Sequence, residues 1–278
     1  MNDNNQRVAY LGSEGSYSYL AAQKYFASKL NYNCASSITE VLSQVTDGSA
    51  TFGIVPIENS TTGGILETYD LLTKNKVFIT GEVYVCIHHQ LLVNPQANLS
   101  DVRVCYSHPQ AIYQCQKFLQ KHTAVEFVYT SDTATAALAV KKNGGTKVAA
   151  IASKNASVRY NLTIAQKNIE DNPKNFTRFA IVSQKPSTQG DKVTLILSLK
   201  HIPGSLYHAI EPIAKNSLNL TKIESRPISG TLWEYLFILD FELASKKGQL
   251  PNILSQIRDR TKKLTILGVY KKGKTYET

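Results

Sequence analysis

The sequence lacks the motifs that usually announce a cofactor or a metal ion. Its four cysteines are Cys34, Cys86, Cys105 and Cys115. They form neither a CxxC pair nor a zinc-like spacing, so we expect free thiols in a reducing compartment. No GxGxxG or GxxxxGK[ST] loop, HExxH helix or GxSxG turn is present, which excludes the common nucleotide, zinc-protease and serine-hydrolase signatures. The adjacent His88 and His89 would point to opposite faces of an extended segment, so we expect no metal site there.

Long apolar runs and concentrated positive charge are also missing. Residues 1–7 are polar and contain no signal-peptide core, and the longest apolar runs, such as residues 236–239, are too short to cross a bilayer. The formal net charge is +10, but lysine and arginine are scattered along the chain. A nucleic-acid-binding protein would gather them on one face. We therefore expect a cytoplasmic protein without membrane or nucleic-acid partners, whose charge steers anions toward it.

Segments typical of strands and helices alternate up to about residue 182. The apolar segments 8–11, 52–55 and 102–106 are each followed by a polar loop. This alternation predicts an α/β region, and two runs of it, split near residues 80–93, predict two lobes. Because ligands of open α/β sheets bind beyond the carboxyl ends of the strands, we expect an active site between the lobes.

Local signals predict where several helices begin. Ser37, followed by Glu40, has the spacing of a capping box, and Asp132 precedes the helical pattern that starts at Thr133. Residues 110–121 have the pattern of one continuous helix after Pro109.

A second domain is predicted after residue 191. Residues 183–191 are nearly free of apolar side chains and contain proline and glycine, as linkers do. The elements that follow have the order βαββαβ, which is typical of ferredoxin-like folds. We therefore divide the chain into a catalytic domain over residues 1–183, a second domain over residues 192–271 and a disordered tail over residues 272–278.

Three polar clusters are candidates for the site. They are Glu58-Asn59-Ser60, Ser107-His108-Pro109 with Gln114, and residues 175–179 (NFTRF). Each one alone is equally typical of a turn, a helix cap or a strand start. Composition and spacing therefore leave two possibilities open, an α/β enzyme and a binding protein, in either case for an anion.

Taken together, these segments resemble the prephenate dehydratase family over nearly the whole chain, from residue 8 to about 270. The resemblance is carried by residues 10–18 (YLGSEGSYS), 55–60 (VPIENS), 106–110 (YSHPQ) with Gln114, 168–171 (NIED) and 175–179. Residues 204–207 (GSLY) and 219–227 (NLTKIESRP) resemble the two phenylalanine-binding motifs of the family's ACT domain. The resemblance implies a two-lobed catalytic region similar to type II periplasmic-binding proteins, followed by a ferredoxin-like ACT domain.

The resemblance also implies an activity, the conversion of prephenate to phenylpyruvate with loss of water and CO₂, and feedback regulation by L-phenylalanine. No cofactor and no metal are expected, because aromatisation drives the reaction. The implied catalytic residues are Thr177, Arg178, Glu58, Asn59, Ser107 and Gln114. The implied substrate-binding residues are Ser60, His108, Phe179 and Asn175. The implied effector-binding residues are Gly204, Ser205, Leu206, Asn219, Leu220, Glu224 and Ser225.

Specific roles follow from the chemistry of these side chains. Arg178 is expected to clamp a carboxylate, and Thr177 to donate a hydrogen bond to the leaving hydroxyl. Glu58 is expected either to supply a proton or to position Arg178, while His108, which precedes Pro109, is expected to be structural. The linker starts shortly after Thr177, so we expect it to transmit the effector's signal.

Alternatives remain open at this point. Arogenate dehydratase has the same motifs, and a non-catalytic amino-acid-sensing binding protein is a more distant possibility. Only seven residues precede the first strand, so we expect a monofunctional enzyme without chorismate mutase activity. An effector site shared between ACT domains implies a homodimer or a homotetramer.

Overall fold

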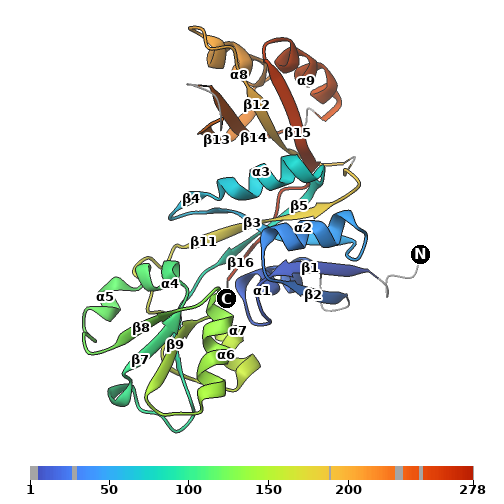
Figure 1. Cartoon of the computed structure of the whole chain (residues 1–278). Helices are drawn as coiled ribbons and strands as arrows, with labels where there is room; N and C mark the ends of the chain where they lie inside the picture. The colour runs from blue at the N-terminus through green and yellow to red at the C-terminus, as the bar shows by residue number, and fades with distance from the viewer. Residues whose placement is uncertain (1–5, 27–29, 188, 229–233, 244–246, 278) are drawn as a thin grey trace.

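The computed structural model describes residues 6–26, 30–187, 189–228, 234–243 and 247–277. They form two lobes and a C-terminal module arranged in a row, with lobe 1 in the middle (Figure 1). Residues 1–5 of the expected catalytic domain and Thr278 of the expected tail lie outside the described residues. No helix in the described ranges is long and apolar enough to span a membrane.

Lobe 1 is built around a seven-stranded sheet with the order β16-β5-β11-β3-β1-β2, in which β4 also pairs with β3. Its elements are β1 (Arg7–Leu11), α1 (Tyr17–Phe26), β2 (Asn31–Ala35), α2 (Ile38–Thr46), β3 (Phe52–Asn59), β4 (Gly63–Gly64), α3 (Leu66–Asn75), β5 (Phe78–Cys86), β11 (Phe176–Ser183) and β16 (Thr275–Tyr276). The predicted cap of α2 is confirmed, since Ser37 accepts a hydrogen bond from the backbone N–H of Glu40 at 3.1 Å.

Lobe 2 contains a five-stranded sheet with the order β10-β6-β9-β7-β8. Its elements are β6 (Gln90–Val93), the 3-10 helix η2 (Leu99–Asp101), β7 (Val104–Ser107), α4 (Pro109–Tyr113), α5 (Gln116–Leu119), β8 (Glu126–Tyr129), α6 (Thr133–Asn143), β9 (Val148–Ala152), α7 (Lys154–Tyr160) and β10 (Thr163–Gln166). The chain passes between the lobes within the segment where the sequence pattern placed the split, residues 80–93. The chain leaves lobe 1 after β5, enters lobe 2 at β6 and returns to lobe 1 with β11.

The single helix predicted over residues 110–121 is wrong, because two short helices occupy this range. The break lies at Gln114 and Cys115. Asp171 causes it from a distant loop: its backbone N–H donates to the carbonyl of Gln114, and its carboxylate accepts from the backbone N–H groups of Gln116 and Lys117. The carboxylate thus caps the start of α5 and interrupts the helical ladder.

The C-terminal module has the predicted βαββαβ order. Its elements are β12 (Lys192–Ser198), α8 (Ser205–Lys215), β13 (Asn219–Pro227), β14 (Tyr235–Glu242), the 3-10 helix η3 (Lys247–Gln249), α9 (Leu250–Asp259) and β15 (Lys263–Tyr270). The strands form an antiparallel sheet with the order β13-β14-β12-β15. This is the ferredoxin-like strand order that the sequence pattern predicted.

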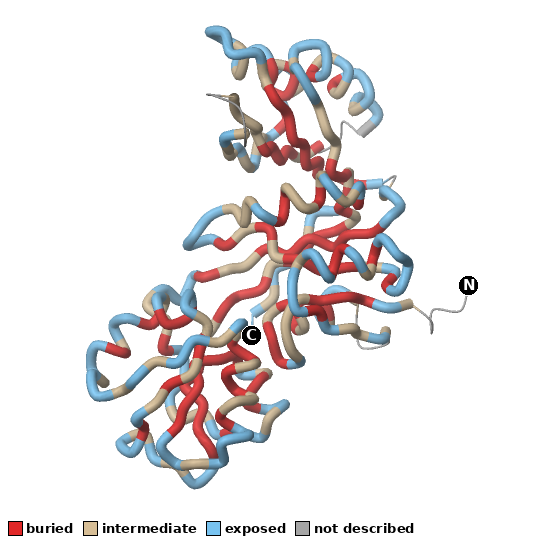
Figure 2. Tube along the Cα trace, viewed as in Figure 1, coloured by how far each residue is buried: buried red, intermediate tan, exposed pale blue. Residues whose placement is uncertain are grey.

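One hydrophobic cluster spans the contact between the module and lobe 1, beside the module's own core. Buried Ile196, Ile238 and Leu267 of the module belong to the same cluster as Leu72 and Ile79 of lobe 1. Figure 2 shows buried residues running from lobe 1 to the inner end of the module. At this contact β15 approaches β5 so closely that a Cβ on Gly268 would lie 2.1 Å from the carbonyl oxygen of Ile79.

The prediction that residues 272–278 are disordered is wrong for the described residues up to Glu277. Thr275 and Tyr276 form β16, which pairs in parallel with β5. The reason is that β5 would otherwise have a free edge, and the tail satisfies it: the N–H of Tyr84 donates to the carbonyl of Lys274 at 3.0 Å. The chain therefore ends beside the junction of the two lobes (Figure 1).

Candidate active site

A cavity of about 270 Å³ lies between the two lobes, and we call it the interlobe cavity. Its lining comes from the ends of β1, β3 and β11 in lobe 1 and from the loops after β7 and β8 in lobe 2. It is lined by Leu11, Ser16, Tyr17, Ser18, Pro56, Asn59, Thr62, Ile65, Ile87, His89, His108, Gln110, Ala111, Gln114, Ser131, Asp132, Thr133, Thr177 and Phe179. No lysine or arginine is among these described lining residues.

Thr177 and Asn59 form a fixed pair on the floor of the interlobe cavity. They lie opposite one another on paired strands β11 and β3, and Asn59 Nδ2 donates to Thr177 Oγ1 at 3.1 Å. The other end of the amide is also held, because Asn59 Oδ1 accepts from the backbone N–H groups of Thr61 and Thr62. Because Thr177 Oγ1 accepts from Asn59, its own hydrogen is left to point toward a ligand.

Gln114 and His89 form a second pair, on the lobe 2 side of the cavity. His89 Nε2 lies 2.9 Å from Gln114 Oε1, and the ring edge of Tyr17 packs against the imidazole. His89 is almost completely buried, and this burial lowers its pKa, so the ring is neutral at neutral pH. The pair therefore presents neutral hydrogen-bonding groups to a ligand.

The start of α1 reaches the cavity through a glycine-bearing loop that lobe 2 holds in place. Gly12 and Gly15 both have a left-handed backbone, with φ of 87° and 91°. Ser153 of lobe 2 donates its hydroxyl to the carbonyl of Gly15 at 2.7 Å. Ser16 caps the helix by accepting from the N–H of Tyr19. The free N–H groups of the first turn give this edge of the cavity partial positive charge.

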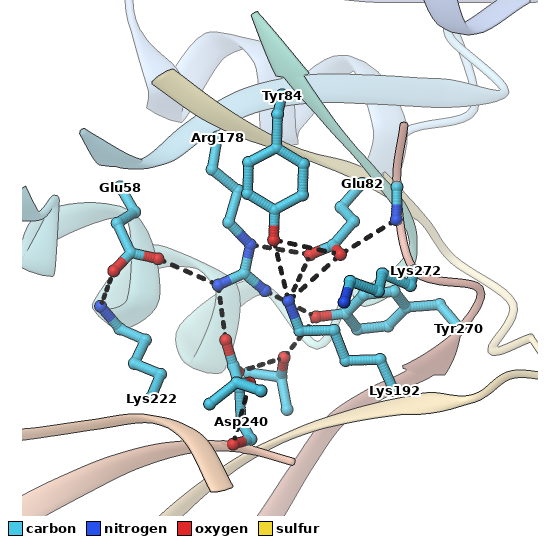
Figure 3. Close-up of polar contacts among 12 residues, drawn as sticks. Glu58, Glu82, Tyr84, Arg178, Lys192, Lys222, Asp240, Tyr270 and Lys272 are labelled. Carbon is cyan, nitrogen blue, oxygen red and sulfur yellow. Dashed lines mark hydrogen bonds and ion pairs between the residues drawn. The ribbon is translucent and has the colours of Figure 1, made fainter. Parts of the chain in front are cut away.

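The prediction that Arg178 clamps a substrate carboxylate is wrong for this structure. Side chains alternate along β11, so Thr177 and Phe179 line the interlobe cavity while Arg178 points to the opposite side. There it is buried among protein partners: it donates to Glu82 at 2.7 Å and to Asp240 at 2.5 Å. Figure 3 shows this arrangement between lobe 1 and the C-terminal module.

The charges around Arg178 compensate one another. Lys192 also bonds Glu82, at 3.0 Å, so two buried cations face two buried carboxylates, Glu82 and Asp240 (Figure 3). Burial alone would lower the pKa of Arg178, but the neighbouring carboxylates outweigh it and raise the pKa. Each buried cation of this group therefore has a carboxylate partner, as a buried ion network requires.

Glu58 and Ser60 also lie on this far side, so their predicted places in the substrate site are wrong. Glu58 bonds Arg178 at 3.0 Å and Lys222 of the module at 2.9 Å, which agrees with the alternative that it positions Arg178. Burial alone would raise the pKa of Glu58. The hydrogen bonds and positive charges of Lys222 and Arg178 outweigh burial, so the pKa of Glu58 is lowered. Ser60 bonds only the backbone of residues 174 and 176 in the described structure.

Ser107 and Asn175 support the site without lining it. Ser107 is fully buried and donates to the carbonyl of Ile151 at 2.8 Å, which ties β7 to β9, so it is not among the lining residues and its contact with substrate stays a prediction. Asn175 Oδ1 accepts a hydrogen bond from Asn59 Nδ2 at 2.7 Å and so helps to fix the orientation of the Asn59 amide. His108 lines the cavity and caps α4 by accepting from the N–H of Gln110.

The predicted effector residues fall into two separate places on the C-terminal module. Gly204, Ser205 and Leu206 line a cavity of about 470 Å³ at the start of α8. The second group belongs to β13, an edge strand of the sheet, and no described residue of β13 lines that cavity. The second group consists of Asn219, Leu220, Glu224 and Ser225.

Sequence reasoning missed His89, Tyr17 and Asp132 as parts of the cavity. The sequence predicted that His88 and His89 form no metal site and gave His89 no other role, although the same alternation that separates it from His88 turns it toward the cavity. Asp132 was predicted only as a helix cap, which it is, since its carboxylate accepts from the N–H groups of Ala134 and Thr135. Its position at the end of a strand was the signal that could have placed it in the site.

Comparisons with known sequences give a consistent result. The family model for prephenate dehydratase matches residues 8–187. The bifunctional chorismate mutase/prephenate dehydratase of Pseudomonas aeruginosa is 38% identical over 270 residues, which cover 96% of this chain and 73% of that protein. The enzyme of the same name from Escherichia coli is 34% identical over 278 residues, which cover 97% and 72%.

Solved structures have the same fold. A prephenate dehydratase from Arthrobacter aurescens in complex with L-Phe is 27% identical, with a TM-score of 0.84 and coverage of 95% of this chain and 90% of that one. The Staphylococcus aureus prephenate dehydratase is 28% identical, with a TM-score of 0.80 and coverage of 95% and 100%. GqqA, described as a novel type of quorum quenching acylase, is 30% identical, with a TM-score of 0.84 and coverage of 95% and 97%.

Proposed function

Because this chain belongs to the prephenate dehydratase family, we propose that it converts prephenate to phenylpyruvate, with loss of water and CO₂, in the interlobe cavity. The observation that carries this assignment of the site is the Thr177–Asn59 pair on the cavity floor. It supplies an oriented hydroxyl donor at a place where a small ligand fits between the lobes.

The absence of a cation from the described cavity lining suits the decarboxylation. The departing carboxylate loses its negative charge as its bonding electrons move into the ring and it leaves as CO₂. An arginine beside it would stabilise the substrate more than the transition state and would slow this step. The network of Glu82, Asp240 and Glu58 keeps Arg178 away from the cavity and so contributes to the reaction indirectly.

Thr177 acts on the leaving hydroxyl. As the C–O bond breaks, negative charge grows on that oxygen, and a donated hydrogen bond from Thr177 stabilises it. The pKa of an alcohol is too high for full proton transfer, so Thr177 contributes orientation and partial charge stabilisation. Asn59 fixes the rotation of the Thr177 hydroxyl, which reduces the reorganisation needed in the transition state.

The retained carboxylate of the substrate is held by neutral donors. Ser16 and Ser18 at the start of α1 line the cavity, and the exposed N–H groups of that first turn attract an anion. Gln110 and Gln114 of lobe 2 lie across the cavity and complete the binding. A substrate that spans both lobes would therefore close them around itself.

The direct test is incubation of the purified chain with prephenate, with phenylpyruvate followed by its absorbance. Arogenate, which differs by one amine, is assayed beside it to decide between the two dehydratase activities. A chain that converts neither substrate, while it remains folded by circular dichroism, would overturn the assignment.

Acylase activity, the one attributed to GqqA, is less well supported by the geometry. A hydrolytic nucleophile needs a base within hydrogen-bond reach. Of the histidines in the described cavity lining, His89 pairs with Gln114 and His108 with the backbone of Gln110. Neither contacts a serine or threonine hydroxyl in the described part of the chain, so the cavity offers no activated nucleophile.

We propose that the C-terminal module is an ACT domain that binds L-phenylalanine between two copies of the chain. The Arthrobacter aurescens prephenate dehydratase in complex with L-Phe supports this choice of ligand. Each module presents the Gly204–Leu206 cavity at one place and the residues of β13 at another. A site that uses both is incomplete in one chain and requires a second copy, which makes the enzyme a homodimer or a dimer of dimers.

Calorimetry tests the effector site. We expect Glu224→Ala to weaken phenylalanine binding. The matched control Asp259→Ala, which removes an exposed carboxylate of α9 away from both groups of effector residues, should have little effect. Equal binding in both variants would contradict the site, and a monomeric mass at all concentrations would contradict the shared arrangement.

We also propose that the enzyme works in the cytoplasm. Cys34, Cys86, Cys105 and Cys115 are all free thiols, which supports a reducing compartment.

A further inference from the structure

We propose that Cys86, His88 and Glu277 bind a divalent metal ion of the zinc class at the junction of the two lobes. This site lies behind the interlobe cavity and is independent of the dehydration chemistry. The sequence predicted no metal here, because the adjacent His88 and His89 would point to opposite faces of an extended segment. The structure brings the C-terminal tail to a Cys-x-His segment from which it is distant in sequence.

The two distances from the ring nitrogen of His88 fit a tetrahedral ion, and all three ligand atoms lie within 4.8 Å of one another. Cys86 Sγ lies 3.3 Å from His88 Nε2, which lies 3.8 Å from Glu277 Oε2. With zinc bonds of about 2.0–2.3 Å, neighbouring ligands of a tetrahedral site are about 3.3–3.8 Å apart. A thiolate, an imidazole and a carboxylate together form a donor set that zinc binds well.

A second carboxylate orients the imidazole as it does in known zinc sites. His88 Nδ1 donates to Glu170 Oε1 at 2.5 Å, and Glu170 is itself buried. The other oxygen of Glu170 accepts from the backbone N–H of His89 at 2.8 Å, so the carboxylate cannot turn away. This contact leaves the lone pair of His88 Nε2 directed at Cys86 and Glu277, and such a carboxylate–histidine pair raises the affinity of the histidine for a metal.

The pairing of β16 with β5 places the third ligand. Tyr276 lies opposite Val85, so the next residue of the tail, Glu277, comes beside Cys86. This register explains why a mostly exposed tail residue meets a buried thiol. An ion at this point would pin the tail to the segment that connects the lobes, residues 87–89.

A catalytic Cys86–His88–Glu170 triad is the competing interpretation of the same contacts. A nucleophilic cysteine needs an activated thiol and access for a substrate. Cys86 is 1% exposed, and its sulfur lies in one group with the ring nitrogen of His88 and a carboxylate oxygen of Glu277. The thiol therefore lacks the access that a nucleophile needs, whereas a place beside an imidazole and a carboxylate suits a metal ligand.

Binding is tested on the full chain after removal of metals with a chelator. Zn²⁺ is titrated by calorimetry, and Co²⁺ is added as a spectroscopic probe. We expect one ion per chain, a thiolate-to-cobalt charge-transfer band and d–d bands of tetrahedral intensity. Zn²⁺ is expected to raise the Tm, because it binds the folded chain in preference to the unfolded one.

Two ligand variants, one variant of the residue that orients His88 and one control test the assignment. Cys86→Ser is expected to abolish the charge-transfer band, while the matched control Cys34→Ser, which changes an exposed thiol, leaves it intact. Glu170→Gln is expected to weaken zinc binding about 10–100-fold through the orientation of His88. Glu277→Gln lies on the exposed tail, so it keeps the fold and should also weaken binding.

Three outcomes would overturn the site. One is a failure of equimolar Co²⁺ to produce the charge-transfer band. Another is a band or an affinity that Cys86→Ser and Glu277→Gln leave unchanged. The third is faster alkylation of Cys86 than of Cys34 by iodoacetamide in the metal-free chain, which would identify Cys86 as a nucleophile.

Discussion

Thr177 and Arg178 are neighbours in the chain, yet they serve opposite sides of one sheet. The hydroxyl of Thr177 faces the interlobe cavity, while the guanidinium of Arg178 holds lobe 1 to the C-terminal module. A shift of one residue in β11 would exchange these roles, since side chains alternate along a strand. The strand therefore connects the hydroxyl proposed to act in catalysis to the interface of the module over a single peptide unit.

Thr177→Ala should lower kcat by about 100–1000-fold, because it removes a hydrogen bond that strengthens in the transition state. The fold should be unaffected, since Thr177 packs at the edge of a cavity. Thr177→Ser keeps the hydroxyl and should retain most of the activity. Steady-state kinetics with prephenate measure both variants, and a normal kcat in Thr177→Ala would remove Thr177 from the mechanism.

Arg178→Met should destabilise the folded state by about 3–5 kcal/mol, because it leaves Glu82 and Asp240 buried without their partner. The matched control Arg159→Met breaks an exposed ion pair with Glu14 and should cost about 1 kcal/mol or less. Urea unfolding measures both. If Arg178→Lys instead raised the KM for prephenate more than tenfold with unchanged stability, Arg178 would contact the substrate after all.

Sequence motifs identified residues near the cavity more reliably than they identified side-chain direction. Thr177, Asn59, Gln114, His108 and Phe179 line the interlobe cavity as expected. Arg178 does not line the cavity, because it bonds buried carboxylates of β5 and β14, which lie far from it in the sequence. Strand alternation alone predicts that Thr177 and Arg178 face apart, so this part of the arrangement is predictable from the sequence.

At the scale of elements, β3 and β13 are joined by the Glu58–Lys222 ion pair. Lys222 also bonds Glu224, a residue of the proposed effector site, at 2.7 Å. Glu58 is followed at once by Asn59, which orients Thr177. Two strands thus connect the proposed effector site and the proposed catalytic groups through one lysine.

The pH dependence of stability should report this ion pair. The pKa of Glu58 is lower in the folded chain than its ordinary value of 4.5, so its contribution is present above about pH 4.5 and is lost as the pH falls through the folded pKa. Glu58→Gln should therefore be less stable than the parent chain at pH 7. The difference in Tm should shrink below pH 4.5, and a constant difference from pH 7 to pH 3 would contradict the pairing.

Element order was predictable and element boundaries were less so. Periodicity and caps such as Ser37 and Asp132 are local, so the sequence displays them directly. The break between α4 and α5 depends on Asp171, and the strand that the tail forms depends on the free edge of β5. Both are tertiary contacts that no local pattern reveals.

At the scale of the whole molecule, two routes connect the module to the active site. One is the linker that follows β11, and the other is the packed interface with its ion network. The interface is the more direct, because Arg178 adjoins Thr177 and Lys222 bonds Glu58.

A pair of variants separates these routes. A flexible glycine-serine insert within residues 186–190 should leave dehydration and the phenylalanine response nearly unchanged, because the interface stays intact. Lys222→Met should leave dehydration measurable and weaken the response to phenylalanine. In ordinary allosteric proteins an effector changes ligand affinity by about 5–150-fold, and in this variant that factor should fall toward one. Prephenate kinetics with and without phenylalanine measure both, and a response lost only on insertion would favour the linker.

The core shared by lobe 1 and the C-terminal module has a consequence for how this protein can change over generations. Modules joined only by a linker can be exchanged by recombination, because each brings its own interior. Here Ile196, Ile238 and Leu267 complete the interior of lobe 1, and the backbone of Gly268 rests on that of Ile79. A foreign regulatory module grafted after residue 191 would leave this face uncovered, so new effector specificity must arise by substitution within the existing module.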